Sequence, residues 1–184
     1  MTQPVSVPLG EMVQQSIKVL TKPSVQTFEE FENRGTMRDA LIYVGVGALI
    51  SGVLGLAGGI GPALGSAIST AVGFFVFVYV VHSVGKAQGG TGTLDQVAYT
   101  FSLFWIPLQV VIAVVGLVLV LTLIGIFLLP LLGIAAIVVS VYFAYLATQS
   151  SLNLTDTTKL VITLVVGMIA SAVVSGIITN IFNR

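Results

Sequence analysis

Few residues of this 184-residue chain have the side chains that catalysis or metal binding requires. The chain has no cysteine and one histidine, His82, which excludes thiolate zinc sites, cysteine nucleophiles and multi-histidine metal cages. His82 and Asp95 form the one candidate acid–base pair, and a histidine hydrogen-bonded at the membrane surface is the favoured interpretation of His82. We therefore expect no catalytic residue, no cofactor site and no metal site.

Two glycine-rich stretches and one acidic run also have structural rather than chemical explanations. Residues 55–61 and 89–93 resemble phosphate-binding loops only in glycine content, because neither ends in the Gly-Lys-Ser/Thr sequence of a nucleotide loop. Both are expected to be turns. The run Glu29, Glu30 and Glu32 could hold a cation weakly, and a solvated helix face is the preferred interpretation.

The composition identifies the class of protein. Hydrophobic residues make up 56% of the chain and charged residues only 8%, with a mean hydropathy of +1.08. Soluble domains carry about 25% charged residues, so this chain could not cover a water-exposed surface. Seven basic and seven acidic residues cancel, which leaves no net charge to attract nucleic acid. The sequence predicts an integral membrane protein.

Three long stretches without Asp, Glu, Lys or Arg hold the membrane spans. They run between residues 39 and 86, 95 and 156, and 159 and 184. About 20 apolar residues form one helical crossing, so the stretches hold two, two and one crossings. Residues 58–62, and Gly125, Pro130 and Gly133, divide the two longer stretches. We predict an all-α bundle of five transmembrane helices at about 38–57, 62–83, 97–123, 131–150 and 157–181.

Helix-capping residues support three of these starts. The run Thr93–Gln96 is a capping box, Thr36–Asp39 is a looser version, and Asp156 can cap the last span.

The basic residues predict the orientation. Five spans place six of the seven Lys and Arg residues on the side of the N-terminus and leave Arg184 on the other. Cytoplasmic loops are enriched in Lys and Arg, so we expect a cytoplasmic N-terminus and an external C-terminus in the cell membrane.

Residues 1–37 are expected to form a cytoplasmic amphipathic segment that precedes the transmembrane domain, residues 38–184. Met12, Ile17 and Leu20 recur at helical spacing, and Phe28 and Phe31 share a face of a second short helix. Such a segment is expected to lie at the lipid interface or to pack on the protein itself. A docking surface for a soluble partner is the alternative.

Small residues recur every four positions along several spans and predict close helix packing. Most of this packing is expected within the bundle, and one stripe could be left for a second copy of the chain. The predicted packing residues are Gly47, Ser51, Gly55, Gly59, Gly65, Ser69, Gly73, Gly167, Ser171 and Ser175.

The third span differs from the others. Pro107 removes a helical hydrogen bond and predicts a kink, and Gln109 beside it either bonds a freed carbonyl or lines a polar crevice. Tyr99 and Trp105 are expected to be aromatic anchors at the membrane interface. No acidic or basic residue lies near the middle of any span, which weighs against pumps and ion-coupled transporters.

The order of these features resembles the Yip (Ypt-interacting protein) domain family, in its bacterial type. The resemblance rests on residues 19–24 and 28–30, on the passage from the glycine-rich loop 89–93 through Tyr99 to Pro107, on the apolar break at 128–133, and on Tyr142 and Tyr145. It extends over about residues 12–182.

The resemblance implies a multi-span membrane protein and assigns no catalytic residue. Eukaryotic members associate with Rab-type GTPases and with one another. This chain lacks their Asp-Leu-Tyr-Gly-Pro motif and their longer N-terminal region, which makes GTPase binding doubtful.

The leading hypothesis is a non-enzymatic membrane protein that organises membrane or partner proteins through helix association and its cytoplasmic face. Its expected partners are membrane lipid and either a second copy or other membrane proteins, and not nucleic acid. The alternative is a small transporter or channel with a polar pathway at Pro107 and Gln109.

Overall fold

The computed structural model describes residues 6–122 and 125–182, and these residues form helices and connecting turns without a β-strand. Five helices are long and apolar enough to cross a membrane, as predicted. The chain thus has the architecture of a multi-pass membrane protein. The element order is α1 (Leu9–Thr21), α2 (Val25–Glu29), α3 (Met37–Gly55), η1 (Leu56–Gly58), α4 (Ile60–Ala87), α5 (Leu94–Val120), η2 (Gly125–Leu128), α6 (Leu129–Leu152) and α7 (Thr157–Phe182).

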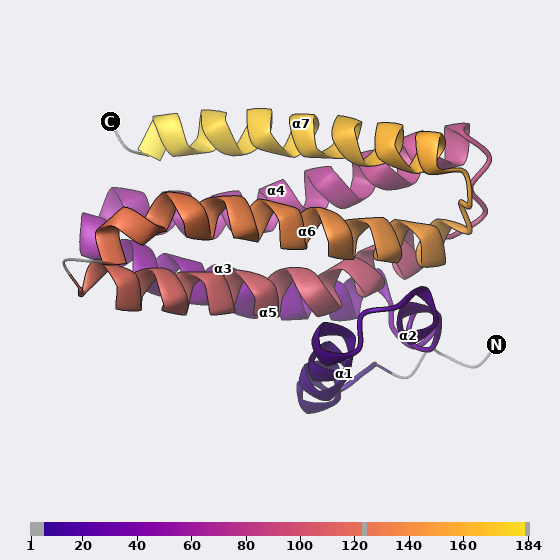
Figure 1. Cartoon of the computed structure of the whole chain (residues 1–184), viewed down its shortest axis with the longest axis horizontal. Coiled ribbons are helices and arrows are strands. Elements are labelled where there is room, and N and C mark those ends of the chain that lie inside the picture. The colour runs from indigo at the N-terminus through magenta and orange to yellow at the C-terminus, as the bar shows by residue number, and fades with distance from the viewer. Residues whose placement is uncertain (1–5, 123–124, 183–184) are drawn as a thin grey trace.

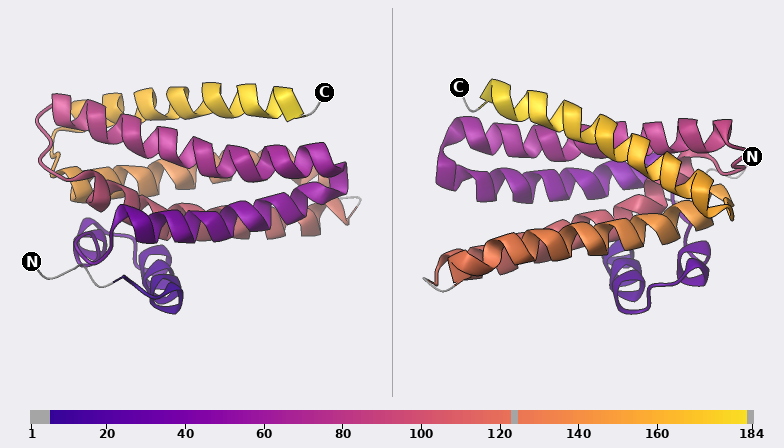
Figure 2. Two further views of the ribbon diagram at one scale, coloured as in Figure 1. Left: turned by 180° about the vertical axis from the view of Figure 1, so that it is seen from behind. Right: turned by 45° about the horizontal axis from the view of Figure 1, so that its top comes forward.

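The five long helices form two groups. Helix α4 makes its most extensive contacts with α7 and α3, whereas α6 packs mainly on α5. The α5–α6 hairpin diverges from α3, α4 and α7 toward the end of the bundle where the C-terminus lies (Figure 2, right). The two chain ends lie toward opposite ends of the bundle (Figure 1). An odd number of crossings has this consequence.

The capping residues start the helices where the sequence predicts. Thr36 with Asp39 and Thr93 with Gln96 form complete capping boxes at α3 and α5. Asp156 accepts hydrogen bonds from the first backbone amides of α7, at 2.8 Å and 3.2 Å. Each cap satisfies amides that the helix itself leaves unpaired.

The turns use residues that tolerate a left-handed backbone. Gly59 (φ 105°) joins η1 to α4, and Gly89 (φ 98°) follows α4. Asn153 (φ 53°) ends α6. Both glycine-rich stretches lie at chain reversals and not within a nucleotide-binding strand–loop–helix unit.

Aromatic side chains hold the two helix groups together on the half of the bundle nearer the N-terminal helices. Phe77 of α4 packs on Phe101 and Trp105 of α5, with 5.2 Å between ring centroids in each pair. Phe104 of α5 stacks on Phe143 of α6 at 5.6 Å. No side chain of residues 129–142 in α6 is buried, as expected for a helix in contact with lipid.

The small residues of α4 and α7 allow their close contact. A Cβ atom at Gly167 would lie 2.7 Å from Val81 Cγ2 and 3.3 Å from the Phe77 ring. Ser171 Oγ donates to the carbonyl oxygen of Gly73 at 2.9 Å. The backbones therefore approach too closely for a larger residue at either glycine.

We expect Gly167→Leu to lower the stability of the protein, because overpacking a buried contact costs about 1–3 kcal/mol. Gly176→Leu is the matched control, since Gly176 lies on the same helix with nothing near its Cβ position. Thermal denaturation of both variants in detergent, followed by size-exclusion chromatography, measures the difference. Equal midpoints for the two variants would show that the α4–α7 contact is not tight.

Candidate functional site

The strongest candidate site is formed where the N-terminal helices dock on the bundle. Helices α1 and α2 lie beside it, near the end that carries the 88–93 and 153–156 loops (Figures 1 and 2). Helix α1 contacts α5, and α2 contacts α6. Their buried side chains belong to the same hydrophobic cluster as those of the spans, so residues 6–36 are part of one folded unit.

Phe28 is the apolar anchor of this docking. Its ring is fully buried and meets Phe104 and Phe143 edge-to-face, at centroid distances of 6.1 Å and 6.5 Å. Met12 and Val19 of α1 are also fully buried. Because an aromatic side chain buries about 150–250 Å², this contact fixes α2 firmly on the bundle.

Buried hydrogen bonds fix the position of α1. The Tyr99 hydroxyl of α5 donates to Gln15 Oε1 at 2.7 Å, and the Ser16 and Tyr43 hydroxyls lie 3.0 Å apart. Tyr99 is fully buried, although the sequence predicted an aromatic anchor at the lipid interface. Since a buried polar group without a partner costs free energy, these pairs tie α1 to one position on α3 and α5.

Two carboxylates complete the interface. Glu32 is 9% exposed and accepts a hydrogen bond from Ser150 Oγ of α6 at 2.7 Å, so the prediction of a solvated acidic face is wrong for this residue. Asp39 is 1% exposed. Besides capping α3, it accepts from the backbone amide of Val7 at 3.2 Å, which ties the chain before α1 to the bundle.

The glycine loop packs against the end of α6. The Thr91 amide donates to the Leu152 carbonyl oxygen at 3.0 Å, and a Cβ atom at Gly92 would overlap the Ser151 carbonyl oxygen. A Cβ atom at Gly35 would likewise overlap the Tyr99 ring. These glycines are required for close approach and not for binding a ligand.

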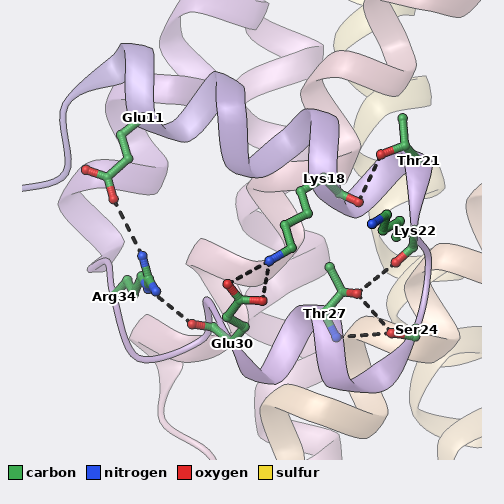
Figure 3. Close-up of polar contacts among 8 residues, drawn as sticks. All are labelled: Glu11, Lys18, Thr21, Lys22, Ser24, Thr27, Glu30 and Arg34. Atoms are coloured by element: carbon green, nitrogen blue, oxygen red, sulfur yellow. Dashed lines mark hydrogen bonds and ion pairs between the residues drawn. The ribbon is translucent and has the colours of Figure 1, made fainter.

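The ionic groove is an open depression of about 500 Å³ between α1 and the turn after α2. Figure 3 shows its charged side chains pointing toward one another. Lys18 pairs with Glu30 at 2.6 Å, and Arg34 approaches Glu11 at 3.8 Å. Both cations lie over the Phe31 ring, 5.4 Å and 5.3 Å from its centroid. The groove is lined by Glu11, Gln14, Gln15, Lys18, Glu30, Phe31 and Arg34.

The opposite face of α1 is apolar and uncovered. Leu9, Val13 and Ile17, here called the α1 stripe, are 42%, 46% and 57% exposed. At 3.6 residues per turn they share one face, and Glu11 and Lys18 point the other way. The ionic groove lies between α1 and the turn after α2, so the α1 stripe is on the side of α1 away from that turn.

Of the five residues predicted to lie at the membrane interface, the structure places three inside the protein. Met12, Phe28 and Phe31 are buried, Leu20 is half-buried, and Ile17 is exposed. The α1 stripe contains only Ile17 of the predicted set.

The predicted packing residues have three kinds of environment. Gly47 faces Ile106, Gly55 faces Ala63, and Gly65 faces Phe182, each at a helix contact like those of Gly73 and Gly167. Ser51 and Ser69 are half-buried, and Ser175 Oγ lies 2.7 Å from a Cβ atom built on Gly73. Gly59 is exposed and forms the left-handed turn before α4 instead.

Pro107 lies inside α5, which continues to Val120. Gln109, one helical turn beyond Trp105, is exposed and lines cavities between the two helix groups. It makes no hydrogen bond with the described residues, so it does not bond a carbonyl freed by the proline. The crevice interpretation of Gln109 fits its position better.

A comparison with known protein families identifies the family of this chain. The family described as Yip1 domain matches residues 17–177, which is most of the chain. The chain belongs to the Yip1 domain family. The matched region begins within α1 and ends within α7, so it includes the last part of α1, all of α2, the four spans α3 to α6 and most of α7. No curated protein and no solved structure matches this Yip1 domain.

Within the described residues of the Yip1 domain, no group of three or more His, Cys, Asp or Glu side chains is placed to hold a metal ion. Sequence reasoning missed Gln15, Glu32, Tyr43 and Tyr99 as docking residues. Their side chains form hydrogen bonds with residues 27 to 118 positions away in the sequence. A local sequence pattern does not predict such pairs.

We expect Tyr99→Phe to loosen α1, because Gln15 Oε1 loses its donor in a buried place. Such a loss costs about 1–3 kcal/mol, so amide hydrogen exchange in α1 should accelerate by about tenfold. Tyr79→Phe is the control, since the Tyr79 side chain is 64% exposed. Unchanged exchange in Tyr99→Phe would mean that the Gln15–Tyr99 hydrogen bond does not help to hold α1.

Proposed function

We propose that this Yip1 domain is a non-enzymatic protein that works by association, using the face formed by α1, α2 and the turn to α3. The observation that carries the proposal is the buried Gln15–Tyr99, Ser16–Tyr43 and Glu32–Ser150 pairs. They make the ionic groove a fixed face of the transmembrane bundle and not part of a tethered tail.

The chemistry of the groove favours a protein partner. Its two cations and two anions are already paired, so it has little net attraction for a simple ion. Exposed ion pairs contribute only about 0–1 kcal/mol each, so they can exchange partners at small cost. A protein segment that carries both charge signs matches this surface.

The α1 stripe supports a position of this face at the membrane surface. Gln15 docks at Tyr99, the sixth residue of α5, which lies about 8 Å along the helix from its start. Helix α5 is about 40 Å long and the hydrocarbon core is about 30 Å thick. We infer that Leu9, Val13 and Ile17 contact acyl chains, and that the partner is itself a membrane protein, a second copy or another chain.

Photo-crosslinking tests this proposal in the native membrane. A photoreactive residue at Gln14, in the ionic groove, should give discrete adducts with a membrane protein or a second copy. At Val13, one position away on the α1 stripe, it should give lipid adducts. Thr158 is the control position, because it is exposed at the start of α7 and lies in neither the ionic groove nor the α1 stripe.

The double exchange Lys18→Glu with Glu30→Lys should abolish the Gln14 adducts, because it keeps the internal ion pair and inverts the charge pattern. Lys22→Glu, outside the groove, should leave them unchanged. Gln14 adducts that survive the exchange, or that consist of lipid alone, would refute the proposal. Deleting residues 9–33 is a poorer test, since it would uncover Phe104 and Tyr99.

We further propose that the N-terminus is cytoplasmic, in a cell membrane, on the basis of the basic residues at that end. The chain has no native cysteine, so single cysteines report the sidedness of each loop directly. In intact cells an impermeant maleimide should label Ala57→Cys and Phe127→Cys and should spare Gln26→Cys and Thr158→Cys. The reverse pattern would invert the orientation.

A further inference from the structure

Two adjoining cavities lie between the helix groups, within the membrane-spanning part of the bundle. The first, here called the apolar slot, has a volume of about 260 Å³. It lies between the α5–α6 hairpin and helices α4 and α7. Its walls include Phe77, Trp105, Ile112, Ala136, Ser140 and Met168.

The second cavity, here called the hydroxyl pocket, has a volume of about 190 Å³. Four hydroxyl side chains, from α4 and α7, line it: Ser69, Thr70, Ser171 and Ser175. Trp105 and Gln109 line both cavities, so the slot and the pocket meet at these two residues. Together their volumes fall within the range of about 300–1,000 Å³ that small-molecule sites occupy.

Polar groups in these cavities lack partners. The Ser69 oxygen is buried without a hydrogen bond. The Gln109 amide makes none with the described residues and lies about 22 Å along α5, near the middle of the helix. Hydrocarbon offers no hydrogen bond at this depth, so both groups would remain unsatisfied next to ordinary acyl chains.

The lining disfavours a charged occupant. No Asp, Glu, Lys, Arg or His side chain lines either cavity, so a phosphate or carboxylate group would find no counter-charge. The apolar slot and the adjoining hydroxyl pocket together suit an uncharged occupant that is apolar along its length and polar at one end.

We propose that the two cavities form one binding site for an uncharged single-chain amphiphile with a hydroxyl or carbonyl head. The head lies in the hydroxyl pocket and exchanges hydrogen bonds with Gln109 and Ser69. The hydrocarbon chain lies in the apolar slot, against Phe77 and over the small side chain of Ala136. This site shares no lining residue with the ionic groove and does not depend on the association proposed above.

Trp105 is the single tryptophan of the chain and lines both cavities, so its fluorescence reports occupancy. The full-length protein in phosphatidylcholine vesicles is titrated with 9,10-dibromooctadecan-1-ol, whose bromine atoms quench indole fluorescence. We expect saturable quenching that unbrominated octadecanol reverses by competition. The matched acid, 9,10-dibromooctadecanoic acid, titrated at a pH high enough to ionise its carboxyl group in the bilayer, should bind at least about tenfold more weakly, because its carboxylate has no counter-charge in the pocket.

Variants separate this site from general lipid contact. Gln109→Leu keeps the size of the side chain and removes the amide, so it should weaken binding of the alcohol about tenfold. Ala136→Phe fills the slot and should abolish saturable quenching. Ile169→Phe is the control, because Ile169 is 59% exposed on the outer face of α7.

Three results would overturn the proposal. The first is quenching that rises linearly with the alcohol, which means bulk partitioning. The second is equal affinity for alcohol and acid, and the third is unchanged affinity in Gln109→Leu. Size-exclusion profiles and thermal midpoints establish that each variant is folded, and Gln109→Leu remains decisive if Ala136→Phe does not fold.

Discussion

Inside a hydrocarbon layer, a polar group can form hydrogen bonds only with other groups of the protein. The structure of the Yip1 domain depends on this constraint. Long apolar helices satisfy the backbone. Two tyrosine hydroxyls near the helix starts are satisfied by residues brought from elsewhere in the chain. Tyr99 and Tyr43 meet Gln15 and Ser16 of α1 in this way.

The same constraint explains why the N-terminal helices pack beside the bundle instead of extending from it. Glu32 and Asp39 are buried carboxylates, and Ser150, Thr36 and the backbone before α1 supply their hydrogen bonds. Removing one partner would leave a desolvated charge, which is far more costly than losing an exposed ion pair. Two cations that stay exposed, Lys18 and Arg34, lie in the ionic groove, where exchanging one ionic partner for another costs little free energy.

Deeper in the membrane the constraint is only partly met. The aromatic contacts of Phe77, Phe101 and Trp105 close one half of the interface between the helix groups. The other half opens, and Gln109 and the hydroxyl group of Ser69 remain there without partners. An unmet hydrogen-bonding capacity beside an apolar slot is the physical reason that this region is a binding site in our proposal.

The sequence by itself determined the five apolar helices. The length of an uncharged stretch is a local property of the sequence, and it can be compared directly with the thickness of the bilayer. It also determined the caps at Thr36, Thr93 and Asp156, whose hydrogen bonds join residues two or three positions apart. Only the tertiary structure decided that Met12 and Phe28 face the protein, that Tyr99 is buried and that Glu32 is not solvated. The helical pattern of α1 and α2 marks an apolar face, but lipid and a protein core are equally apolar. The choice between them depends on partners distant in the sequence, which no local spacing encodes.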